Sequence, residues 1–335
     1  MHRIGGKTKD MITPGLVARV TSKYLTEHSR RRAVRRVRAH YDDFVVRLWR
    51  DLVSGRFLPG RYHWKKIGGN GVKERTILVP TVRDAIAASV LVETFCDFAD
   101  KRLYPHTFCN RRGLGSKALA VRMHAHIMRD KPKYYVKFDI RKCFDSVLHT
   151  DAVDYIRRVV KNRTVSETII RLAIPAEITG DRGIPIGNGL SHHIANGVLS
   201  PIWFAGRRMQ GVTGLWAYMD DVIITGNNKR KLMRAVAGIG ALLAEHGFSY
   251  KYPPHVAQCT EGIDMVGFRF WPDGRRRLRR RNFRHARRAV HGKNPRRCAA
   301  YLGMAILAHD KPLVEALHRR IREGKRNGAF ENRKH

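Results

Sequence analysis

Two adjacent carboxylates, Asp220 and Asp221, lie between two short apolar runs in the segment 215–225. Like charges at the tip of a tight hairpin repel each other unless a cation holds them. Hard divalent cations such as Mg²⁺ bind carboxylate oxygens, and a pair of such ions aligns an attacking oxygen with a leaving phosphate. The alternative is an ordinary Asp-Asp turn between two strands, since Asp is a common turn residue.

A third acid, Asp139, ends an expected strand at 134–140 and is followed five residues later by Phe144. If this strand neighbours the 215–225 hairpin, the three carboxylates converge at one end of an antiparallel sheet. That arrangement suits two Mg²⁺ ions and a triphosphate. The aromatic ring beyond the acid can lie under the sugar of a bound nucleotide. Asp139 as a simple strand-end cap is the alternative.

The charge of the chain points to a polyanionic partner. Its 335 residues include 66 Lys and Arg against 28 Asp and Glu, which gives a formal net charge of +38. Nucleic acid is the leading candidate, because release of counterions from phosphates drives binding. An anionic membrane surface is the second candidate. No run of about 18 apolar residues occurs, so we expect no membrane-spanning helix.

The five cysteines are scattered and form no C-x-x-C pair, so we expect neither a structural zinc site nor a disulfide framework. The N-terminal residues lack the apolar core of a signal peptide. Both features fit a reducing, cytoplasmic compartment.

Hydrophobic periodicity and turn residues predict the elements that position the acids. A basic amphipathic helix is expected over 30–52, and its arginines are either a solvated face or a nucleic-acid contact. Asn282 is expected to cap one late helix, and another is expected to open near Asp310. The other expected elements are strands at 62–67 and 74–79 around a glycine-rich turn at 68–71, helices at 84–99, 151–160, 166–174, 191–199 and 229–246, and strands at 134–140 and 266–271.

Several sequence motifs between about residues 60 and 290, and the order in which they occur, resemble those of reverse transcriptases, in particular the small bacterial retroelement type. Residues 218–221 match the Y-x-D-D motif, and residues 138–145 match the first catalytic motif with Phe144 at the steric-gate position. The other matching segments are the fingers hairpin at 71–84, the following fingers segment at 105–118, the template and nucleotide loop at 183–191 and the primer grip at 266–268.

The resemblance implies an α+β right-hand polymerase whose antiparallel palm sheet carries the catalytic acids. Residues 1–132 would form a basic N-terminal helix and fingers. Residues 133–272 would form the palm with part of the fingers at about 150–182. Residues 273–335 would form a basic helical thumb, with the boundary near Asp273. Such an enzyme copies RNA into DNA from dNTPs.

The resemblance also assigns roles to residues of this chain. Asp139 and Asp220 would be the primary ligands of two Mg²⁺ ions, for which Mn²⁺ can substitute, with Asp221 supporting and Ile140 completing the site. The remaining assignments are nucleotide binding by Arg75, Lys66, Lys73, Phe144, Gly187 and Ile186, the primer grip by Gly267 and Phe268, and nucleic-acid binding by Arg275, Arg276, Arg277, Arg284, Arg287 and Arg288.

Departures from the common loop pattern leave the subgroup open. Ile186 stands where most of the family has Gln, and His192 stands where it has Pro. The sequence around Ile186 resembles that of enzymes of diversity-generating retroelements, whose copying is error-prone. Residues 191–193 depart from that subgroup. The defence-associated bacterial enzymes are therefore the alternative subgroup. Adjacent His192 and His193 diverge on a helix, which favours core or template-contact roles over metal binding.

The expected partners are a dedicated noncoding RNA template, a DNA primer or product, dNTPs and an accessory protein or second copy of the chain.

A function of another class also fits the charge and the fold. The chain could be a catalytically weak RNA-binding scaffold that kept a polymerase fold.

Overall fold

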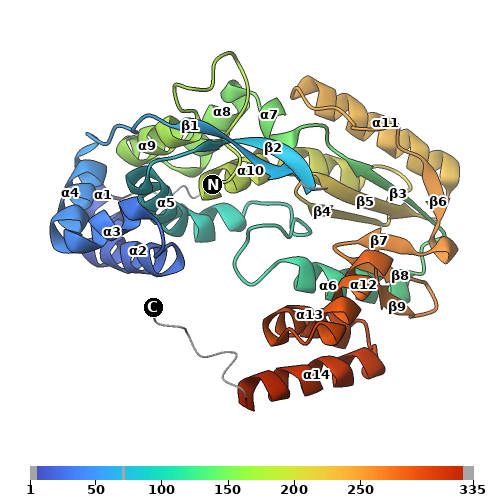
Figure 1. The fold of residues 1–335 in the computed structure, drawn as a ribbon. Helices are drawn as coiled ribbons and strands as arrows, with labels where there is room; N and C mark the ends of the chain where they lie inside the picture. The colour runs from blue at the N-terminus through green and yellow to red at the C-terminus, as the bar shows by residue number, and fades with distance from the viewer. Residues whose placement is uncertain (1–5, 70–71, 327–335) are drawn as a thin grey trace. The chain divides into compact units, whose positions relative to one another are not determined.

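The chain consists of groups of helices separated by antiparallel strands, and the computed structural model describes residues 6–69 and 72–326 (Figure 1). The chain forms two compact units. The first comprises residues 1–112, 140–205 and 239–252, and the second comprises residues 113–139, 206–238 and 253–335. The mixture of helices with antiparallel sheets agrees with the α+β class expected from the sequence.

The first unit is mainly helical. Its helices are α1 (Thr8–Met11), α2 (Pro14–Glu27), α3 (Arg32–Ala39), α4 (Tyr41–Ser54), α5 (Val82–Asp100), α7 (Cys143–Ser146), α8 (His149–Val159), α9 (Arg163–Ala173) and most of α10 (Gly189–Arg208). Helix α5 packs against α2, α4 and α9, and its residues Ile86, Val90, Leu91 and Phe95 are fully buried. This apolar face explains why the expected helix at 84–99 forms.

The single helix expected over 30–52 is wrong, because the structure breaks it at His40. His40 has φ −126° and ψ 46°, outside the helical range, and is both the C-cap residue of α3 and the N-cap residue of α4. Helix α3 buries only Val34, whereas α4 buries Val45, Leu48 and Leu52. The two segments therefore pack separately, which periodicity across an arginine-rich run does not reveal.

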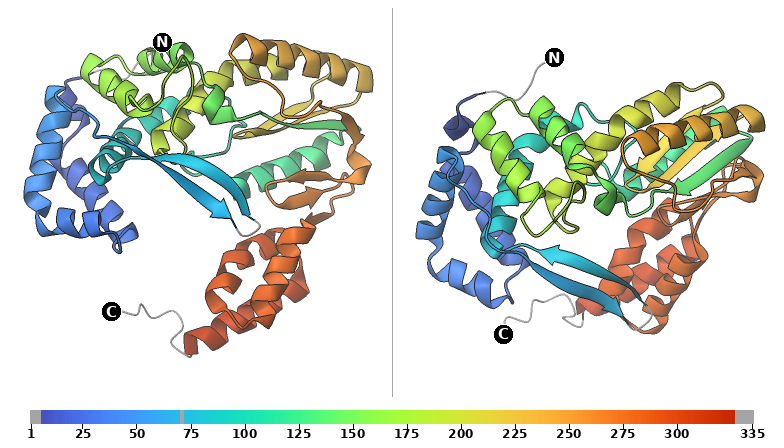
Figure 2. Two further views of the ribbon diagram at one scale, coloured as in Figure 1. Left: turned by 45° about the horizontal axis from the view of Figure 1, so that its top comes forward. Right: turned by 90° about the horizontal axis from the view of Figure 1, so that it is seen from above.

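Strands β1 (His63–Gly69) and β2 (Val72–Val79) form a two-stranded antiparallel ribbon in the first unit (Figure 2). Both expected strands are confirmed. The expected turn at 68–71 includes residues 70 and 71, which lie outside the described residues.

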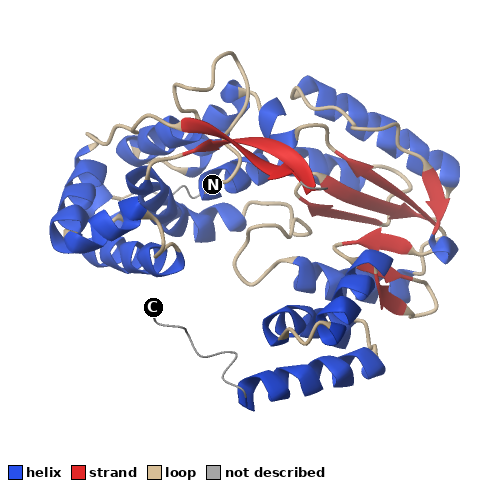
Figure 3. Ribbon diagram, viewed as in Figure 1, coloured by secondary structure: helices blue, strands red, loops and turns tan. Residues whose placement is uncertain are grey.

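A four-stranded antiparallel sheet lies at the centre of the second unit (Figure 3). Its strands, in spatial order, are β4 (Gly214–Tyr218), β5 (Asp221–Gly226), β3 (Tyr134–Asp139) and β6 (Val256–Gln258). Val222, Ile223 and Ile224 on β5 have no exposed surface. Because both faces of this strand are covered, its register is firmly specified.

Helix α6 (Ser116–Asp130) packs against β4 in the same unit. Helix α11 (Lys229–Glu245) follows β5 and begins in this unit, where Leu232 lies against Gly226. It ends before Gly247, whose φ of +77° is the left-handed conformation that commonly terminates helices. The helix expected over 229–246 is therefore confirmed to within a residue.

A smaller sheet of three short antiparallel strands follows: β7 (Ile263–Met265), β8 (Phe268–Phe270) and β9 (Arg276–Leu278). The single strand expected over 266–271 is wrong at its start. Val266 and Gly267 have φ values of +43° and +90° and form the turn that joins β7 to β8. Strand β9 has two arginines among its three residues and carries no hydrophobic alternation to reveal it.

The chain then forms three helices that pack on one another: α12 (Arg280–His291), α13 (Pro295–Leu307) and α14 (Lys311–Arg326) (Figure 2). Helix α12 begins at Arg280, so the cap expected at Asn282 is wrong. The Asn282 amide instead donates to the carbonyl oxygen of Gly267 at 3.3 Å. The opening of α14 is confirmed, since Asp310 Oδ1 accepts from the backbone N–H of Leu313 at 3.2 Å.

Candidate active site

The hairpin between β4 and β5 places Asp220 at its tip. Tyr218 and Asp221 are the last paired residues, so only Met219 and Asp220 form the turn. Met219 has φ +55°, which a bulky residue rarely adopts, and its side chain is only 8% exposed. Asp220 is exposed. The buried Met219 anchors a strained turn, and such strain is common at functional sites.

Asp139 and Asp221 face each other across the junction of β3 and β5. They are the final partners of the antiparallel register that also pairs Phe138 with Val222. Directly opposite residues project from the same face of a sheet with their Cβ atoms about 5 Å apart. The structure therefore confirms that the strand of Asp139 neighbours the hairpin, and it brings all three predicted acids to one end of one sheet.

The two carboxylate oxygens of Asp221 differ in their hydrogen bonding. Its Oδ2 accepts from Lys137 Nζ at 2.9 Å, while its Oδ1 is buried and has no hydrogen-bond partner among the described residues. Burial raises the pKa of Asp221 above its usual value, Lys137 opposes this shift, and the charge of Asp139 adds to it. A cation near Oδ1 would relieve both the desolvation and the repulsion.

Lys137 is a functional candidate that the sequence reasoning missed. Its ammonium group bridges the Asp221 carboxylate and the carbonyl oxygen of Asp264, each at 2.9 Å. The Asp264 carboxylate in turn lies 3.8 Å from Arg279, the residue that precedes α12. The signal was available, because a residue two positions before Asp139 on a strand shares its face.

The donors at this edge are of the kind that Mg²⁺ prefers, namely carboxylate oxygens. The unpartnered Oδ1 of Asp221 fits such an ion. Within the described residues, no three His, Cys, Asp or Glu side chains lie close enough together to hold a metal ion as they stand. Ile140, predicted to complete the site, belongs to the first unit, where it is 1% exposed and pairs with Tyr250.

In the first unit, the predicted nucleotide loop lies beside Phe144. The backbone N–H of Ile184 donates to the carbonyl oxygen of Phe144 at 3.1 Å. The Phe144 ring is half-buried and packs edge-on against His192, with 5.1 Å between the ring centroids. Ile186 is half-buried and lines a cavity of about 250 Å³, and Gly187 follows it with φ +94°. These predicted residues therefore do share one region.

The two adjacent histidines behave as expected for residues that diverge on a helix. His193 is 2% exposed, and its Nε2 lies 3.1 Å from Cys96 Sγ. Burial lowers the pKa of His193 to about 4, which keeps the imidazole neutral. The expected core role is confirmed for His193.

The predicted triphosphate ligands lie on the β1–β2 ribbon. Arg75 pairs with Ile67 and Lys66 with Thr76 in the register, and the side chains of Arg75 and Lys66 are exposed. The side chain of Lys73 lies outside the described residues.

The predicted primer-grip residues form a tight junction in the second unit. The carbonyl oxygen of Gly267 accepts from the backbone N–H of Arg279 at 2.9 Å. Gly267 has φ +90°, a left-handed conformation that favours glycine, and a Cβ atom there would also displace the Asn282 amide. Phe268 is 1% exposed and packs near Phe270.

The predicted nucleic-acid-binding arginines fall into two groups. Arg284, Arg287 and Arg288 are exposed on α12, whose buried residues are Ala286 and Ala289. Arg275, Arg276 and Arg277 lie on and just before β9, where Arg275 and Arg277 are exposed and Arg276 is half-buried. Burial lowers the pKa of Arg276 below its usual value.

Comparison with known proteins gives one family. A sequence profile described as reverse transcriptase (RNA-dependent DNA polymerase) matches residues 73–269, which is more than half of the 335-residue chain. The match includes Asp139, Asp220 and Asp221. No curated protein matches the chain. In the described part of the chain, no helix has the length and apolar character needed to cross a membrane.

Proposed function

This chain belongs to the reverse transcriptase family, and we propose that it synthesises DNA on an RNA template by nucleotidyl transfer at Asp139, Asp220 and Asp221. The observation that carries the proposal is the register of β3 with β5, which puts Asp139 opposite Asp221 and next to the hairpin tip that bears Asp220. The family match covers this same segment.

Asp139 and Asp220 would hold two Mg²⁺ ions, or Mn²⁺ in their place, with support from Asp221. When bound, these ions stabilise the charge that develops as the primer 3′-OH attacks the α-phosphate of a dNTP and pyrophosphate leaves. Lys137 fixes one oxygen of Asp221 and leaves the other available. It also offsets the repulsion between Asp221 and Asp139.

We assign the right-hand polymerase parts as the sequence suggests, with fingers in 1–132, palm in 133–272 and thumb in 273–335. Arg75, Lys66 and Lys73 would bind the triphosphate, because cationic side chains on an exposed ribbon can pair with phosphate oxygens. Phe144 would contact the sugar, and Ile186 with Gly187 would contact the templating base. Gly267 and Phe268 would support the primer strand. The arginines near β9 and on α12 would follow the nucleic-acid backbone.

The net charge of +38 suits a nucleic-acid partner, because phosphate contacts dominate the affinity for such polyanions. We propose that the chain acts in a bacterial retroelement or an anti-phage defence system, with a dedicated noncoding RNA and an accessory protein or a second copy of the chain as partners.

The decisive experiment measures incorporation of dNTPs on a primed homopolymer RNA with Mg²⁺, for the wild type and for Asp139→Ala. We expect synthesis by the wild type only, with RNA binding retained in both proteins. An RNA-binding protein that incorporates no dNTP under any divalent ion would instead be the catalytically weak scaffold.

A further inference from the structure

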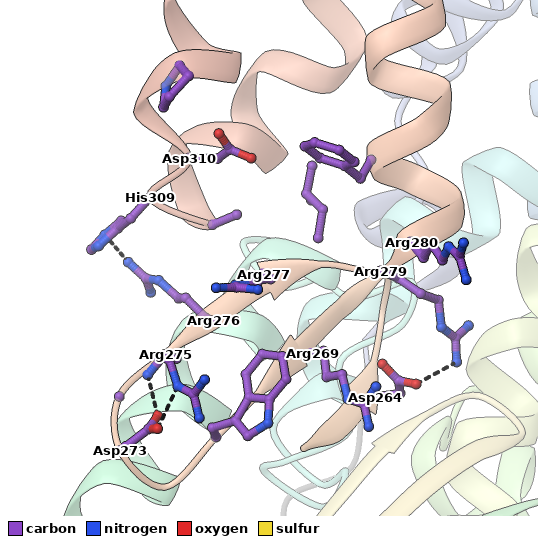
Figure 4. A pocket seen from close by; sticks show the side chains of 16 residues that line it. Asp264, Arg269, Asp273, Arg275, Arg276, Arg277, Arg279, Arg280, His309 and Asp310 are labelled. Atoms are coloured by element: carbon purple, nitrogen blue, oxygen red, sulfur yellow. Dashed lines mark hydrogen bonds and ion pairs between the residues drawn. The ribbon is translucent and has the colours of Figure 1, made fainter. Parts of the chain in front are cut away.

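An arginine-rich pocket in the second unit includes none of the three acids, although Lys137 links Asp221 to its lining residue Asp264. It is lined by β7, β8 and β9, by the start of α12 and by the turn before α14 (Figure 4). The cavity has a volume of about 1040 Å³, which is enough for a small organic ligand. All of its lining residues belong to one compact unit.

The charges in this pocket are strongly unbalanced. Three carboxylates, those of Asp264, Asp273 and Asp310, line it. The six guanidinium groups that line it are those of Arg269, Arg275, Arg276, Arg277, Arg279 and Arg280.

Two of the carboxylates lie beside arginines of the same pocket. Asp273 holds Arg275 at 2.6 Å, and Asp264 lies 3.8 Å from Arg279 (Figure 4). The third, Asp310, caps the first turn of α14. Across the described residues, no carboxylate forms an ion pair with Arg277 or Arg280. Positive charge is therefore left over in a partly enclosed space.

The β8–β9 register concentrates this excess charge. Arg269 and Arg277 are directly opposite each other, and like charges at such positions repel. Asp264 faces Arg269 from the other neighbouring strand and offsets part of this repulsion. Arg276 nearby contacts His309, yet its Nε is buried and lacks a hydrogen-bond partner in the described part of the chain. An anion between the guanidinium groups would remove the repulsion, and phosphate matches their planar fork of donors.

Much of the remaining lining is apolar and suited to a planar ring. Leu278, Phe283, Ala308 and Pro312 contribute this wall. Trp271 lies beside it and is already contacted by two guanidinium groups, those of Arg269 at 5.5 Å and Arg275 at 5.3 Å from its ring centroid. An aromatic ring such as that of Phe283 can stack on a nucleobase without regard to sequence, and the aliphatic side chains add apolar contact.

We propose that this pocket binds a nucleoside phosphate, with the phosphate between Arg269 and Arg277 and the base against the wall that contains Phe283. The ligand is either a free nucleotide or one unpaired nucleotide of a single strand. The site includes none of Asp139, Asp220 and Asp221, so it stands whether or not the chain polymerises DNA.

The test is calorimetric titration with AMP and, separately, with a single-stranded RNA hexamer in EDTA, which removes divalent ions from the acids. The pocket variant is Arg269→Gln/Arg277→Gln. The matched control is Arg230→Gln/Arg234→Gln, which removes the same charge from exposed positions on α11. Thermal melting of both variants monitors folding, and Arg277→Lys, which keeps the charge but loses the fork, is the milder pocket variant.

We expect the pocket variant to bind AMP roughly tenfold or more weakly than the control variant, with Arg277→Lys in between. If AMP binds none of the proteins, the proposal holds only where Phe283→Leu also weakens hexamer binding, because loss of charge alone matches the backbone role already assigned to Arg277. Equal affinities of the pocket and control variants for both probes would overturn it.

A second variant tests the base. Phe283→Leu should weaken AMP binding several-fold and leave the affinity for inorganic phosphate unchanged, because only the stacking surface is reduced. If inorganic phosphate binds the wild type as tightly as AMP does, the pocket is a simple anion site and the proposal is wrong.

Discussion

The two charged regions of the second unit differ in how firmly the fold holds their side chains. The acidic edge (Asp139, Asp220 and Asp221) is attached to strands β3 and β5, and β5 continues into fully buried residues. The arginine surface (Arg275–Arg277, Arg284, Arg287 and Arg288) is carried by a three-residue strand and the outer face of a helix. Chemistry at a reacting phosphate requires fixed geometry, whereas binding to a phosphate backbone requires only positive charge.

This difference predicts that substitutions at the acidic edge abolish activity, whereas substitutions at the arginine surface each weaken binding by a small amount. It also predicts that the rate of cDNA synthesis and the affinity for RNA can be changed separately. Acid variants should lose rate and keep RNA binding, while arginine variants should do the reverse.

The largest effect is expected for Asp220→Ala. Loss of a carboxylate at the hairpin tip should lower the rate of cDNA synthesis by roughly 10³-fold, the equivalent of several kcal/mol of lost transition-state stabilisation. The affinity for RNA, measured by filter binding, should stay within about twofold. A variant that retains a tenth of the wild-type rate would contradict the role assigned to Asp220.

The arginine surface should show the opposite behaviour. The triple change of Arg284, Arg287 and Arg288 to Gln should weaken RNA binding by up to about 10²-fold, at no more than about 1 kcal/mol for each exposed contact. It should also lower the slope of log affinity against log salt by about 2 to 3 units. The rate of cDNA synthesis at saturating RNA should be unchanged. An unaltered salt slope would place the RNA elsewhere.

Lys137 tests whether the acidic edge depends on its neighbours. Lys137→Met should reduce the rate about tenfold, because Asp221 loses the group that orients it. Lys137→Arg should retain more activity, and Lys133→Met, which removes an exposed charge just before β3, should have little effect. Rates and RNA affinities of the three variants are compared at several Mg²⁺ concentrations. Equal rates for Lys137→Met and Lys133→Met would show that the ion pair does not position Asp221.

Phe144 tests whether the contrast extends to the first unit, where a ring is held by packing rather than by charge. Its ring is fixed edge-on against His192, so we expect it to exclude a 2′-OH by shape. In Phe144→Ala, the use of rNTPs relative to dNTPs should rise several-fold to about tenfold. Competition between the two substrates in primer extension measures this ratio. Identical discrimination in the wild type and the variant would remove Phe144 from the nucleotide site.

The sequence predicts the acidic edge better than the arginine surface for a physical reason. The acids follow strands with a clear apolar pattern, which fixes both the strands and their ends. Strand β3 alternates buried Val136 and Phe138 with half-buried residues before Asp139, and β4 is almost wholly buried. Around β9 the residues are mostly arginine, so hydrophobic periodicity carries no information there. Asn282 donates a hydrogen bond to Gly267 in the turn at Val266–Gly267 instead of capping a helix. This contact joins residues that are distant in the sequence, so no local pattern predicts it.

The smallest effect is expected at Ile186, which touches the reacting groups only through the templating base. It is half-buried on a loop, beside Gly187 in a left-handed conformation. Where most of the family has Gln, with a donor and an acceptor, Ile offers neither and its branched Cβ is stiff. A templating base with fewer polar contacts is positioned less tightly, and small displacements at a reacting centre change rates.

We therefore expect the wild type to copy with low fidelity and Ile186→Gln to lower its error frequency by about two- to threefold, a difference of well under 1 kcal/mol between match and mismatch. Sequencing of cDNA made by both proteins on one template measures it, and Ile184→Val, a conservative change at a buried position of the same loop, is the control. An unchanged error spectrum with retained activity would mean that this side chain does not set fidelity. It would also favour the defence role over diversity generation.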